Sequence, residues 1–422
     1  MTGSIYNEWG FRNTPFSTTA LEPTELGRKL LVGRDNEVRQ LLARLKNAPK
    51  LPTLEGSNGV GKTSLVNVTT YEAMQQHRSS LGPLFVACRR AFQLKPDAKA
   101  DDFVREVFVE IGHTLVEFSN LGLTPGAVNT EQIERCLTSP HSDATTARLK
   151  QLIAGGRGAH VDDIVALVRA WLRDTFSSHG DGGVVCIIDN IELLQTSDAA
   201  RQLIEQLRDL VLTQPGIRWV LCGAAGIVRS VVASPRMEGL LHSPMELKGV
   251  DDRHASSILP SRQNAYAERP DAYLPILADD FERLYRIVHG NLRFALGDAD
   301  NFCMWIAERE LPQTDAERRT AFQNWLRGET EAKLQSVEDK IPPRTMTVFK
   351  KAIEIGGEFS PSDFESFGFR SSQTMRPHVK ALEDLGLLIS LQDDTDRRRK
   401  TVSITPKGWY VDYGFGLRER PA

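Results

Sequence analysis

One glycine-rich stretch near the start of the chain constrains the fold more than any other. Residues 56–63 read Gly-Ser-Asn-Gly-Val-Gly-Lys-Thr and fit the pattern G-x-x-x-x-G-K-[ST], in which loop amides surround the phosphates of a nucleoside triphosphate. The apolar segment Leu51–Leu54 before the loop can form a strand, and residues 64–68 after it can continue as a helix. Such a helix directs its positive end at the anion. We therefore expect a strand, a phosphate-binding loop and a helix in this order.

The loop positions have distinct expected roles. Gly56 and Gly61 allow a backbone conformation and a closeness of approach that a Cβ atom would obstruct. Lys62 is expected to reach the β and γ phosphates of ATP, and Thr63 to place its hydroxyl on Mg²⁺. The predicted ATP-binding set is Gly56, Ser57, Asn58, Gly59, Val60, Gly61, Lys62, Thr63 and Ser64.

A second stretch supplies a candidate metal ligand. Residues 184–188 read Val-Val-Cys-Ile-Ile and are followed by Asp189. Apolar residues in a row that end in an acid are typical of a buried parallel strand, which brings a carboxylate to the C-terminal edge of a sheet. We expect Asp189 to hold Mg²⁺ through water beside Thr63. Residues 218–223 are predicted to form a further buried strand.

The composition is that of an ordinary globular protein. With 422 residues, 41% of them hydrophobic and 25% charged, the chain has room for about two or three domains. The net charge of −3 excludes a globally basic nucleic-acid coat, so contact with DNA needs a local patch. The five cysteines form no C-x-x-C pair and indicate neither a zinc site nor a disulfide framework. Because neither a leader peptide nor a membrane-spanning run is visible, we expect a cytoplasmic protein.

Changes of pattern along the chain predict four segments. They are an N-terminal arm (1–30), a nucleotide-binding core (31–250) with an irregular insertion at about 119–160, a helical segment (251–341) and a C-terminal module (342–422). We expect the aromatic arm to pack onto the domain that follows it. Within the insertion a short helix is expected at 132–137. Pro342 and Pro343 break the chain before the last module.

Several stretches together resemble a known family. Residues 56–63, Ile188-Asp189, the strand ending at Gly223 and Gly290-Asn291-Leu292-Arg293 occur in the order and rough spacing of AAA+ ATPases. The resemblance covers about residues 31–310, and it is strongest to origin-recognition initiators and to the related transposition and STAND-type switch ATPases. It implies an α/β fold in which a three-layer P-loop parallel sheet is followed by a helical lid. It also implies a homo-oligomer with ATP at its subunit interfaces.

The resemblance implies roles for arginines outside the loop. In that family the arginine of the G-N-x-R stretch lies in the helical lid and touches the γ-phosphate, a role that carries over to Arg293. A second arginine, supplied by a neighbouring subunit, follows the last core strand, and either Arg236 or Arg229 can fill this role. The alternative reading of each is a solvated surface arginine.

The sequence departs from the family pattern at two places. Many AAA+ enzymes have a catalytic glutamate directly after the metal-binding aspartate, where it orients the attacking water. This chain has Asn190 there and Glu192 two positions further on, and an amide cannot accept the proton of the water. A polar residue is also usual near the end of the strand that here runs to Gly223. Both departures predict slow ATP hydrolysis, as in a switch rather than a fast motor.

The C-terminal module resembles a winged helix-turn-helix. Three short helices are expected, the second beginning at Ser360 and the third capped by Ser371 or Ser372 and ending at Gly386. Strands are expected at 387–391 and 401–405. The segment between these strands resembles the wing of MarR-type regulators.

This second resemblance predicts contacts with double-stranded DNA. The third helix is expected to enter the major groove with Gln373, Arg376 and Lys380, while the wing lies along the backbone or minor groove. The predicted wing contacts are Arg397, Arg398, Arg399 and Lys400. Between residues 343 and 422 there are 13 Lys and Arg against 11 Asp and Glu, a weak positive balance for a DNA-binding module. Winged helices also contact proteins.

Two functions stay open on the sequence alone. The leading hypothesis is an ATP-dependent AAA+ switch that assembles on DNA through its C-terminal domain. The alternative is a STAND-like regulatory ATPase of a multi-protein system, for example in host defence, whose winged helix contacts a protein partner. A metabolic P-loop kinase is disfavoured, because no acceptor site is visible and such an enzyme has no need of a winged helix.

Overall fold

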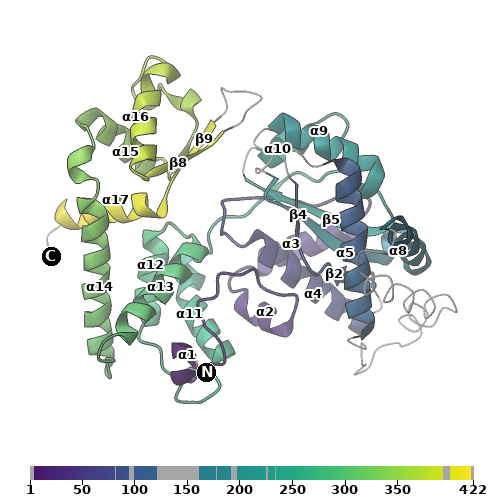
Figure 1. Ribbon diagram of the computed structural model, residues 1–422, viewed down its shortest axis with the longest axis horizontal. Helices are drawn as coiled ribbons and strands as arrows, with labels where there is room; N and C mark the ends of the chain where they lie inside the picture. The colour runs from purple at the N-terminus through teal and green to yellow at the C-terminus, as the bar shows by residue number, and fades with distance from the viewer. Residues whose placement is uncertain are drawn as a thin grey trace. The chain divides into compact units, whose positions relative to one another are not determined.

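The fold is that of a computed structural model of the whole chain (Figure 1). The structure describes residues 4–80, 82–94, 99–120, 161–176, 178–191, 197–224, 227–232, 234–392 and 400–419. The predicted insertion lies outside the described residues from 121 onward, together with its expected helix at 132–137. Glu192 and the predicted wing residues Arg397, Arg398 and Arg399 also lie outside them.

The chain divides into two compact units. The core unit spans Ala20–Leu247, and the C-terminal unit combines Met1–Thr19 with Lys248–Ala422. The core unit contains the phosphate-loop sequence, and the C-terminal unit contains the segments predicted as lid and winged helix. The predicted segment limits near residues 30, 250 and 341 stay predictions.

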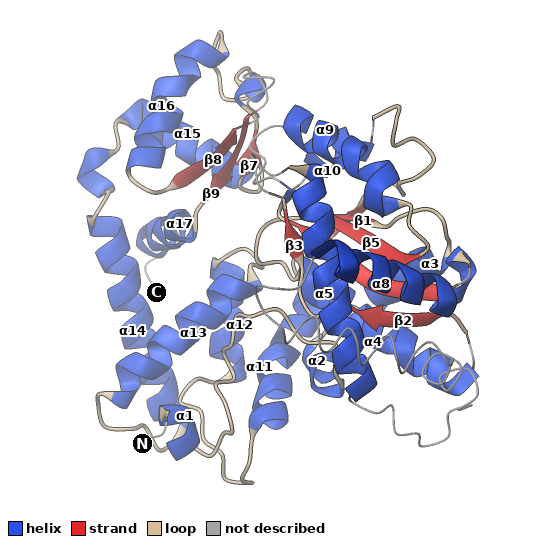
Figure 2. Ribbon diagram, turned by 45° about the vertical axis from the view of Figure 1, so that its right-hand side comes forward, coloured by secondary structure: helices blue, strands red, loops and turns tan. Residues whose placement is uncertain are grey.

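A parallel sheet forms the centre of the core unit (Figure 2). Its strands are β1 (Thr53–Glu55), β2 (Leu84–Ala87), β3 (Phe92–Gln93), β4 (Gly182–Asp189), β5 (Gly216–Gly223) and β6 (Met245–Glu246). The order across the sheet is β2-β4-β5-β1-β6, β3 also pairs with β4, and these pairings are parallel. The strand β1, which leads into the glycine-rich loop, therefore lies between β5 and β6.

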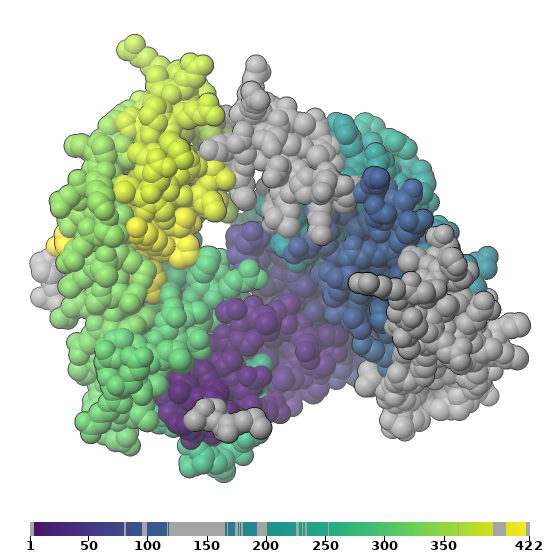
Figure 3. Space-filling view, viewed as in Figure 1, coloured from purple at the N-terminus to yellow at the C-terminus, as the bar shows by residue number. Residues whose placement is uncertain are grey.

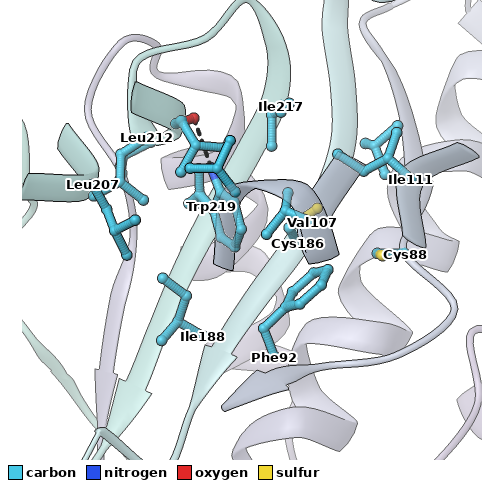
Figure 4. Packing of buried hydrophobic residues seen from close by; sticks show 14 of the residues in the cluster. Cys88, Phe92, Val107, Ile111, Cys186, Ile188, Leu207, Leu212, Ile217 and Trp219 are labelled. Atoms are coloured by element: carbon cyan, nitrogen blue, oxygen red, sulfur yellow. Dashed lines mark hydrogen bonds between the residues drawn. The ribbon is translucent and has the colours of Figure 1, made fainter. Parts of the chain in front are cut away.

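Alternate side chains of the central strands face two separate hydrophobic cores. On β4, Cys186 and Ile188 join one core, while Val185 joins the other. Figure 4 shows the first core around Trp219, whose indole N–H donates to the carbonyl of Val211 at 3.1 Å. The unbroken apolar run in the sequence thus reflects a strand that is covered on both faces.

Helices cover both faces of this sheet. They are α3 (Asp35–Lys46), α4 (Lys62–Ser80), α5 (Ala100–Asn120), α8 (Val161–Thr175), α9 (Ser197–Leu207) and α10 (Ile227–Val232), and α2 (Glu25–Leu30) packs on α4. Leu41 of α3 and Leu65 of α4 belong to one core, and Phe108 of α5 and Leu172 of α8 belong to the other. The result is the three-layer α/β fold around a parallel sheet that the sequence predicts.

The C-terminal unit begins as a helical assembly that includes the N-terminal arm. Its first helices are α1 (Ile5–Glu8), α11 (Asp252–Tyr266), α12 (Ala278–Ile287), α13 (Leu292–Ala307) and α14 (Asp315–Gln335). Tyr6 donates to Asp300 at 2.5 Å, and the buried Arg262 donates to the carbonyls of Pro15 and Ser17 at 2.8 and 3.1 Å. The expectation that the arm packs onto the domain following it was wrong for residues 4–19. The arm instead supplies the carbonyl partners that the buried guanidinium of Arg262 requires.

The described residues from 343 onward form most of the predicted winged-helix elements. They are α15 (Pro343–Glu354), β7 (Glu358–Phe359), α16 (Ser372–Asp384), β8 (Leu388–Gln392), β9 (Lys400–Ile404) and α17 (Pro406–Glu419), with the antiparallel sheet order β7-β9-β8. Ser371 caps α16 by accepting from the amide of Thr374 at 3.4 Å. The expected second helix is wrong, because only a 3₁₀ turn, Pro361–Asp363, forms there. The chain soon folds back to place the Phe367 ring 4.6 Å from that of Phe359, which leaves room for a single turn.

The winged-helix elements pack on the helices that precede them. Tyr410 of α17 donates to Asp298 of α13 at 2.9 Å, and the ring of Trp409 stacks on that of His289 with centroids 4.3 Å apart. The ammonium of Lys333 on α14 lies 4.5 Å from the centre of the Tyr410 ring. Figure 3 shows α14 and α17, in green and yellow, in contact. The two predicted segments are therefore one packed body. No helix in the described part of the chain is both long and apolar enough to cross a membrane.

Candidate functional site

The glycine-rich loop connects β1 to α4 at the C-terminal edge of the sheet. The amide of Gly56 donates to the carbonyl of Gly223 at 3.2 Å, which fixes the start of the loop to β5. A Cβ atom on Gly56 would lie 2.4 Å from the carbonyl oxygen of Leu247, and Gly61 has a φ of +101°. The first glycine is therefore required by space and the second by backbone conformation. The helix α4 begins at Lys62, directly after the loop.

Lys62 and Thr63 occupy the first turn of α4. The ammonium of Lys62 is buried and donates to the carbonyls of Gly56 and Ser57 at 2.8 and 3.2 Å. The hydroxyl of Thr63 donates to the Oδ2 atom of Asp189 at 2.5 Å. Asp189 is the last residue of β4, and its Oδ1 atom accepts from the amide of Asn190 at 2.9 Å. The structure thus brings Lys62, Thr63 and Asp189, predicted separately, to one place.

This arrangement fits a magnesium nucleotide. Mg²⁺ prefers oxygen ligands and usually retains several waters, so one hydroxyl and one carboxylate beside the triphosphate are a suitable protein contribution. The loop residues Ser57 and Asn58 are exposed, and Gly59 and Thr63 are half-buried. The roles of these residues stay predictions.

The predicted catalytic positions are partly described. Asn190 follows the metal-binding position with a left-handed φ of 54°, which asparagine tolerates better than most residues. Glu192 lies outside the described residues. At the end of β5 the chain has Gly223, which is buried and carries no side chain. The position directly after Asp189, where the family pattern has a side-chain carboxylate, therefore carries the side-chain carboxamide of Asn190.

The two candidate interface arginines lie in different environments. Arg229 on α10 donates from Nε to both carboxylate oxygens of Glu55, at 2.8 and 3.1 Å, and from a terminal nitrogen to one of them. Hydrogen bonding by the Glu55 carboxylate raises the pKa of Arg229. Arg236 has a side chain that is 60% exposed and lies 3.9 Å from a carboxylate oxygen of Glu205. Glu55 was not among the predicted site residues, although an acid in an otherwise apolar strand just before the loop is an unusual feature.

A buried arginine that contacts the loop was also missed. Arg34 is 4% exposed, pairs with Glu37 at 2.8 Å and donates to the carbonyl of Val60 at 3.4 Å. The segment before Arg34 contacts α4, the helix that follows the loop, because the Leu21 amide donates to the Ser64 hydroxyl at 3.0 Å. The only sequence signal for Arg34 was its place in a turn before a helix.

Arg293, the predicted lid arginine, is the second residue of α13 and is exposed. Asn291 caps this helix by accepting from the amide of Phe294 at 3.3 Å. Arg293 belongs to the C-terminal unit, whereas Lys62 and Asp189 belong to the core unit. Its contact with a γ-phosphate stays a prediction.

The predicted DNA-reading helix has one buried and one exposed face. Met375, Val379 and Leu382 of α16 are buried, whereas Gln373, Arg376 and Lys380 are exposed. Lys380 pairs with Asp384 at 2.9 Å, which reduces the positive charge that this face offers. Lys400 begins β9 opposite Gln392, and Arg397, Arg398 and Arg399 lie outside the described residues. Arg370, one residue before the cap of α16, is also exposed and was missed.

Comparisons with known proteins find similarity at the level of solved structures. Neither a protein-family model nor a curated protein matches the chain. The Orc1 protein of Aeropyrum pernix in complex with DNA is 16% identical, with 93% of each chain covered and a TM-score of 0.42. The Orc2 protein of Aeropyrum pernix, in ADPNP and ADP complexes, is 14% identical, with 97% of this chain and 99% of that chain covered and a TM-score of 0.47. Cdc6p from Pyrobaculum aerophilum is 16% identical, with 96% and 98% covered and a TM-score of 0.39.

These neighbours are of the origin-recognition type that the sequence resembles. Their identities lie below 20% and their TM-scores below 0.5. We therefore infer function from the residues of this chain.

Proposed function

We propose that this chain is an ATP-binding AAA+ switch ATPase with slow hydrolysis, which assembles on double-stranded DNA in an ATP-dependent way. The observation that carries the nucleotide part is the meeting of Lys62, Thr63 and Asp189 at the C-terminal edge of the sheet. Lys62 and Thr63 come from the first turn of α4 and Asp189 from the end of β4, so their convergence depends on how the helix packs on the sheet. The loop amides and the start of α4 add positive potential for an anion.

The side chains at this edge have complementary tasks when ATP binds. The ammonium of Lys62 donates to two neutral carbonyls, and charged phosphate oxygens are stronger acceptors. We expect Lys62 to move from the Gly56 and Ser57 carbonyls to the β and γ phosphates. Thr63 and Asp189 would hold Mg²⁺, which supplies positive charge to the phosphate oxygens when it is bound.

Slow hydrolysis follows from the group beside Asp189. Asn190 can orient a water by hydrogen bonding, but its amide cannot accept a proton. We expect Asn190→Glu to raise the rate of ATP hydrolysis and Glu192→Gln to lower it. Single-turnover hydrolysis measures both. If the wild-type protein hydrolyses ATP at a rate typical of motor ATPases, the proposal of a slow switch ATPase is contradicted.

The DNA part rests on the exposed face of α16 and on how its module is attached. The hydrogen bond from Tyr410 to Asp298 and the stacking of Trp409 on His289 fix α17 to α13 and to the turn that precedes it. Arg293 lies at the start of that same α13. A contact between Arg293 and the γ-phosphate would therefore reposition the DNA-reading helix without an intervening flexible linker.

A titration of the full chain with double-stranded DNA, with and without ATP and at two salt concentrations, tests this function. We expect tighter binding with ATP and a clear loss of affinity at higher salt, because phosphate contacts release counterions. The Lys62→Ala variant should lose nucleotide binding and the ATP effect on DNA together. An affinity for DNA that depends on neither ATP nor salt concentration would contradict the proposal.

One observation favours a second candidate, a STAND-like ATPase whose winged helix contacts a protein. The exposed face of α16 is partly neutralised, since Lys380 pairs with Asp384. Replacing Arg397, Arg398 and Arg399 by Ala separates the two functions. Loss of DNA affinity supports the DNA-bound switch, whereas unchanged DNA affinity with loss of a co-purifying protein supports the second candidate.

A further inference from the structure

An ion pair between a buried carboxylate and an exposed arginine lies directly before the phosphate-binding loop. Glu55 is the last residue of β1, and its side chain has no exposed surface. Arg229 approaches it from α10 and binds both carboxylate oxygens. The two residues are 174 positions apart in the sequence, and both belong to the core unit. Such a two-point contact fixes the orientation of both groups.

The position of this pair in the sheet relates it to the end of β5. Glu55 is in register with Gly223 of β5 on one side and with Glu246 of β6 on the other. Neighbouring residues in a parallel register direct their side chains to the same face, but Gly223 has none. The guanidinium of Arg229 therefore supplies a polar group to a strand end that otherwise has none of its own. Arg229 comes from α10, the helix that follows β5.

The charge of Glu55 restricts what Arg229 can do. A carboxylate with no exposed surface is strongly destabilised if its cation leaves. The triphosphate expected at the adjacent loop would add repulsion between like charges. If the Arg229 side chain reached into a neighbouring subunit, the buried Glu55 carboxylate would lose its compensating positive charge. The side chains of both arginines are exposed, at 63% for Arg229 and 60% for Arg236, but Arg236 is not restricted in this way, because its partner Glu205 is partly exposed and 3.9 Å away.

We propose that Arg229 acts within its own subunit as a positioning residue, paired with Glu55 to fix the phosphate loop and to present positive charge at the end of β5, and that Arg236 is the arginine that reaches a neighbouring subunit. The proposal rests on the proposed ATPase function, since it assigns roles at that same site. It separates two arginines that the sequence leaves equivalent.

A double-mutant cycle on the full chain tests the role of the pair. The variants are Glu55→Gln, Arg229→Ala and the double variant, each measured for nucleotide affinity, single-turnover hydrolysis and melting temperature. We expect Arg229→Ala to lower the hydrolysis rate about tenfold while nucleotide affinity changes less than about threefold. The double variant removes the unpaired carboxylate, so it should recover the melting temperature of the wild type but not its hydrolysis rate. Arg229→Lys, which keeps a cation, should recover part of that rate.

A purely structural pair predicts a different result. In that case the double variant, which leaves no charge buried, regains wild-type hydrolysis together with wild-type stability, and the proposal is overturned. Arg39→Ala is a matched control, because Arg39 is an exposed arginine of the same unit and donates to Asn36 on the surface of α3. It should leave all three measurements unchanged.

Mixing of subunits tests the assignment within or between subunits. The Lys62→Ala subunit lacks a working loop but carries both arginines. Added in excess, it should restore hydrolysis to Arg236→Ala, whose loop is intact, and should not restore it to Arg229→Ala. Rescue of Arg229→Ala, or rescue of neither variant, overturns the assignment.

Failure of the underlying function gives a separate signature. If wild type and Lys62→Ala bind magnesium ATP equally, the proposed function fails before either arginine is considered. If Lys62→Ala abolishes binding but Arg229→Ala hydrolyses ATP at the wild-type rate, only the assignment of Arg229 fails.

Discussion

The Thr63 hydroxyl donates to the Asp189 carboxylate at 2.5 Å across 126 residues of sequence. The contact forms because β4 and β1 lie in one parallel sheet with only β5 between them, so their C-terminal ends share an edge. Carboxyl ends of parallel strands are where ligands of such sheets bind. A hydroxyl and a carboxylate already aligned need little rearrangement to receive a metal ion, which lowers the entropic cost of binding.

The first prediction concerns this hydroxyl. Thr63→Ala should weaken the binding of ATP in the presence of Mg²⁺ by about tenfold or more, because the contact between the Thr63 hydroxyl and the metal ion is lost. Binding of ATP in EDTA should change little. Thr63→Ser keeps the hydroxyl and should stay within about threefold of wild type. Equilibrium titration with a fluorescent ATP analogue checks all three values, and equal losses for Ala and Ser contradict a role for the hydroxyl.

The second prediction concerns two adjacent glycines in the winged-helix module. Gly356 and Gly357 have φ values of +90° and +89°, but a Cβ atom would meet open space at the first and the ring of Trp409 at 2.4 Å at the second. Replacement by Ala costs about 1–2 kcal/mol at either position from backbone strain. At Gly357 the clash should add about 1–3 kcal/mol. Thermal unfolding should therefore show a lower melting temperature for Gly357→Ala than for Gly356→Ala.

Equal melting temperatures for these two variants would show that Trp409 does not pack there in solution. Since Trp409 also stacks on His289, that result would weaken the argument that the winged helix and α13 move together.

The third prediction concerns the pH dependence of stability. Asp280 on α12 is 4% exposed, its Oδ2 atom has no hydrogen-bond partner, and burial raises its pKa from 3.8 to about 6. A raised pKa means that the folded state binds the proton more tightly than the unfolded state. The contribution of this group is fully present below pH 3.8 and is lost as the pH rises through about 6.

Asp280→Asn removes this dependence. At pH 8 the variant should be more stable than wild type by about 1–3 kcal/mol, and at pH 4.5 the gain should be much smaller. Asp279→Asn is the control, because Asp279 is exposed and pairs with Arg319 at 3.2 Å; its effect should stay within about 1 kcal/mol at either pH. Denaturant unfolding at the two pH values measures both variants. A gain that does not depend on pH contradicts the ionisation of a buried Asp280.

The sequence predicted the parts of this protein that local patterns determine. The loop at residues 56–63 and the run ending at Asp189 are contiguous, and their apolar and glycine patterns have one simple structural solution. The pair Glu55–Arg229 was missed because nothing local relates residues 174 positions apart. The docking of the arm on Arg262 was also missed, since it depends on a buried cation more than 240 positions away.

The second winged-helix element shows a different limit. Ser360 and Asp363 form the local hydrogen bond typical of a helix start, with the Ser360 amide donating to the Asp363 carboxylate at 2.8 Å. The helix-start hydrogen bond therefore forms, but the chain turns back after a single 3₁₀ turn, where the Phe367 ring contacts the Phe359 ring. Tertiary packing overrides a local helix signal here.

The last prediction concerns the charge of the DNA-reading face. Arg376 and Lys380 are both exposed on α16, but Lys380 is paired with Asp384 at 2.9 Å. If α16 enters the major groove, Arg376→Ala should weaken DNA binding by about 1–3 kcal/mol, and Lys380→Ala should weaken it less. Asp384→Asn should tighten binding and steepen the salt dependence by about one counterion, because it frees the Lys380 ammonium for a phosphate. Lys351→Ala, on α15 and paired with Glu354 at 2.8 Å, is the control off the reading helix. Filter binding at several salt concentrations measures the slopes, and an Asp384→Asn variant with unchanged DNA affinity would place α16 away from the nucleic acid.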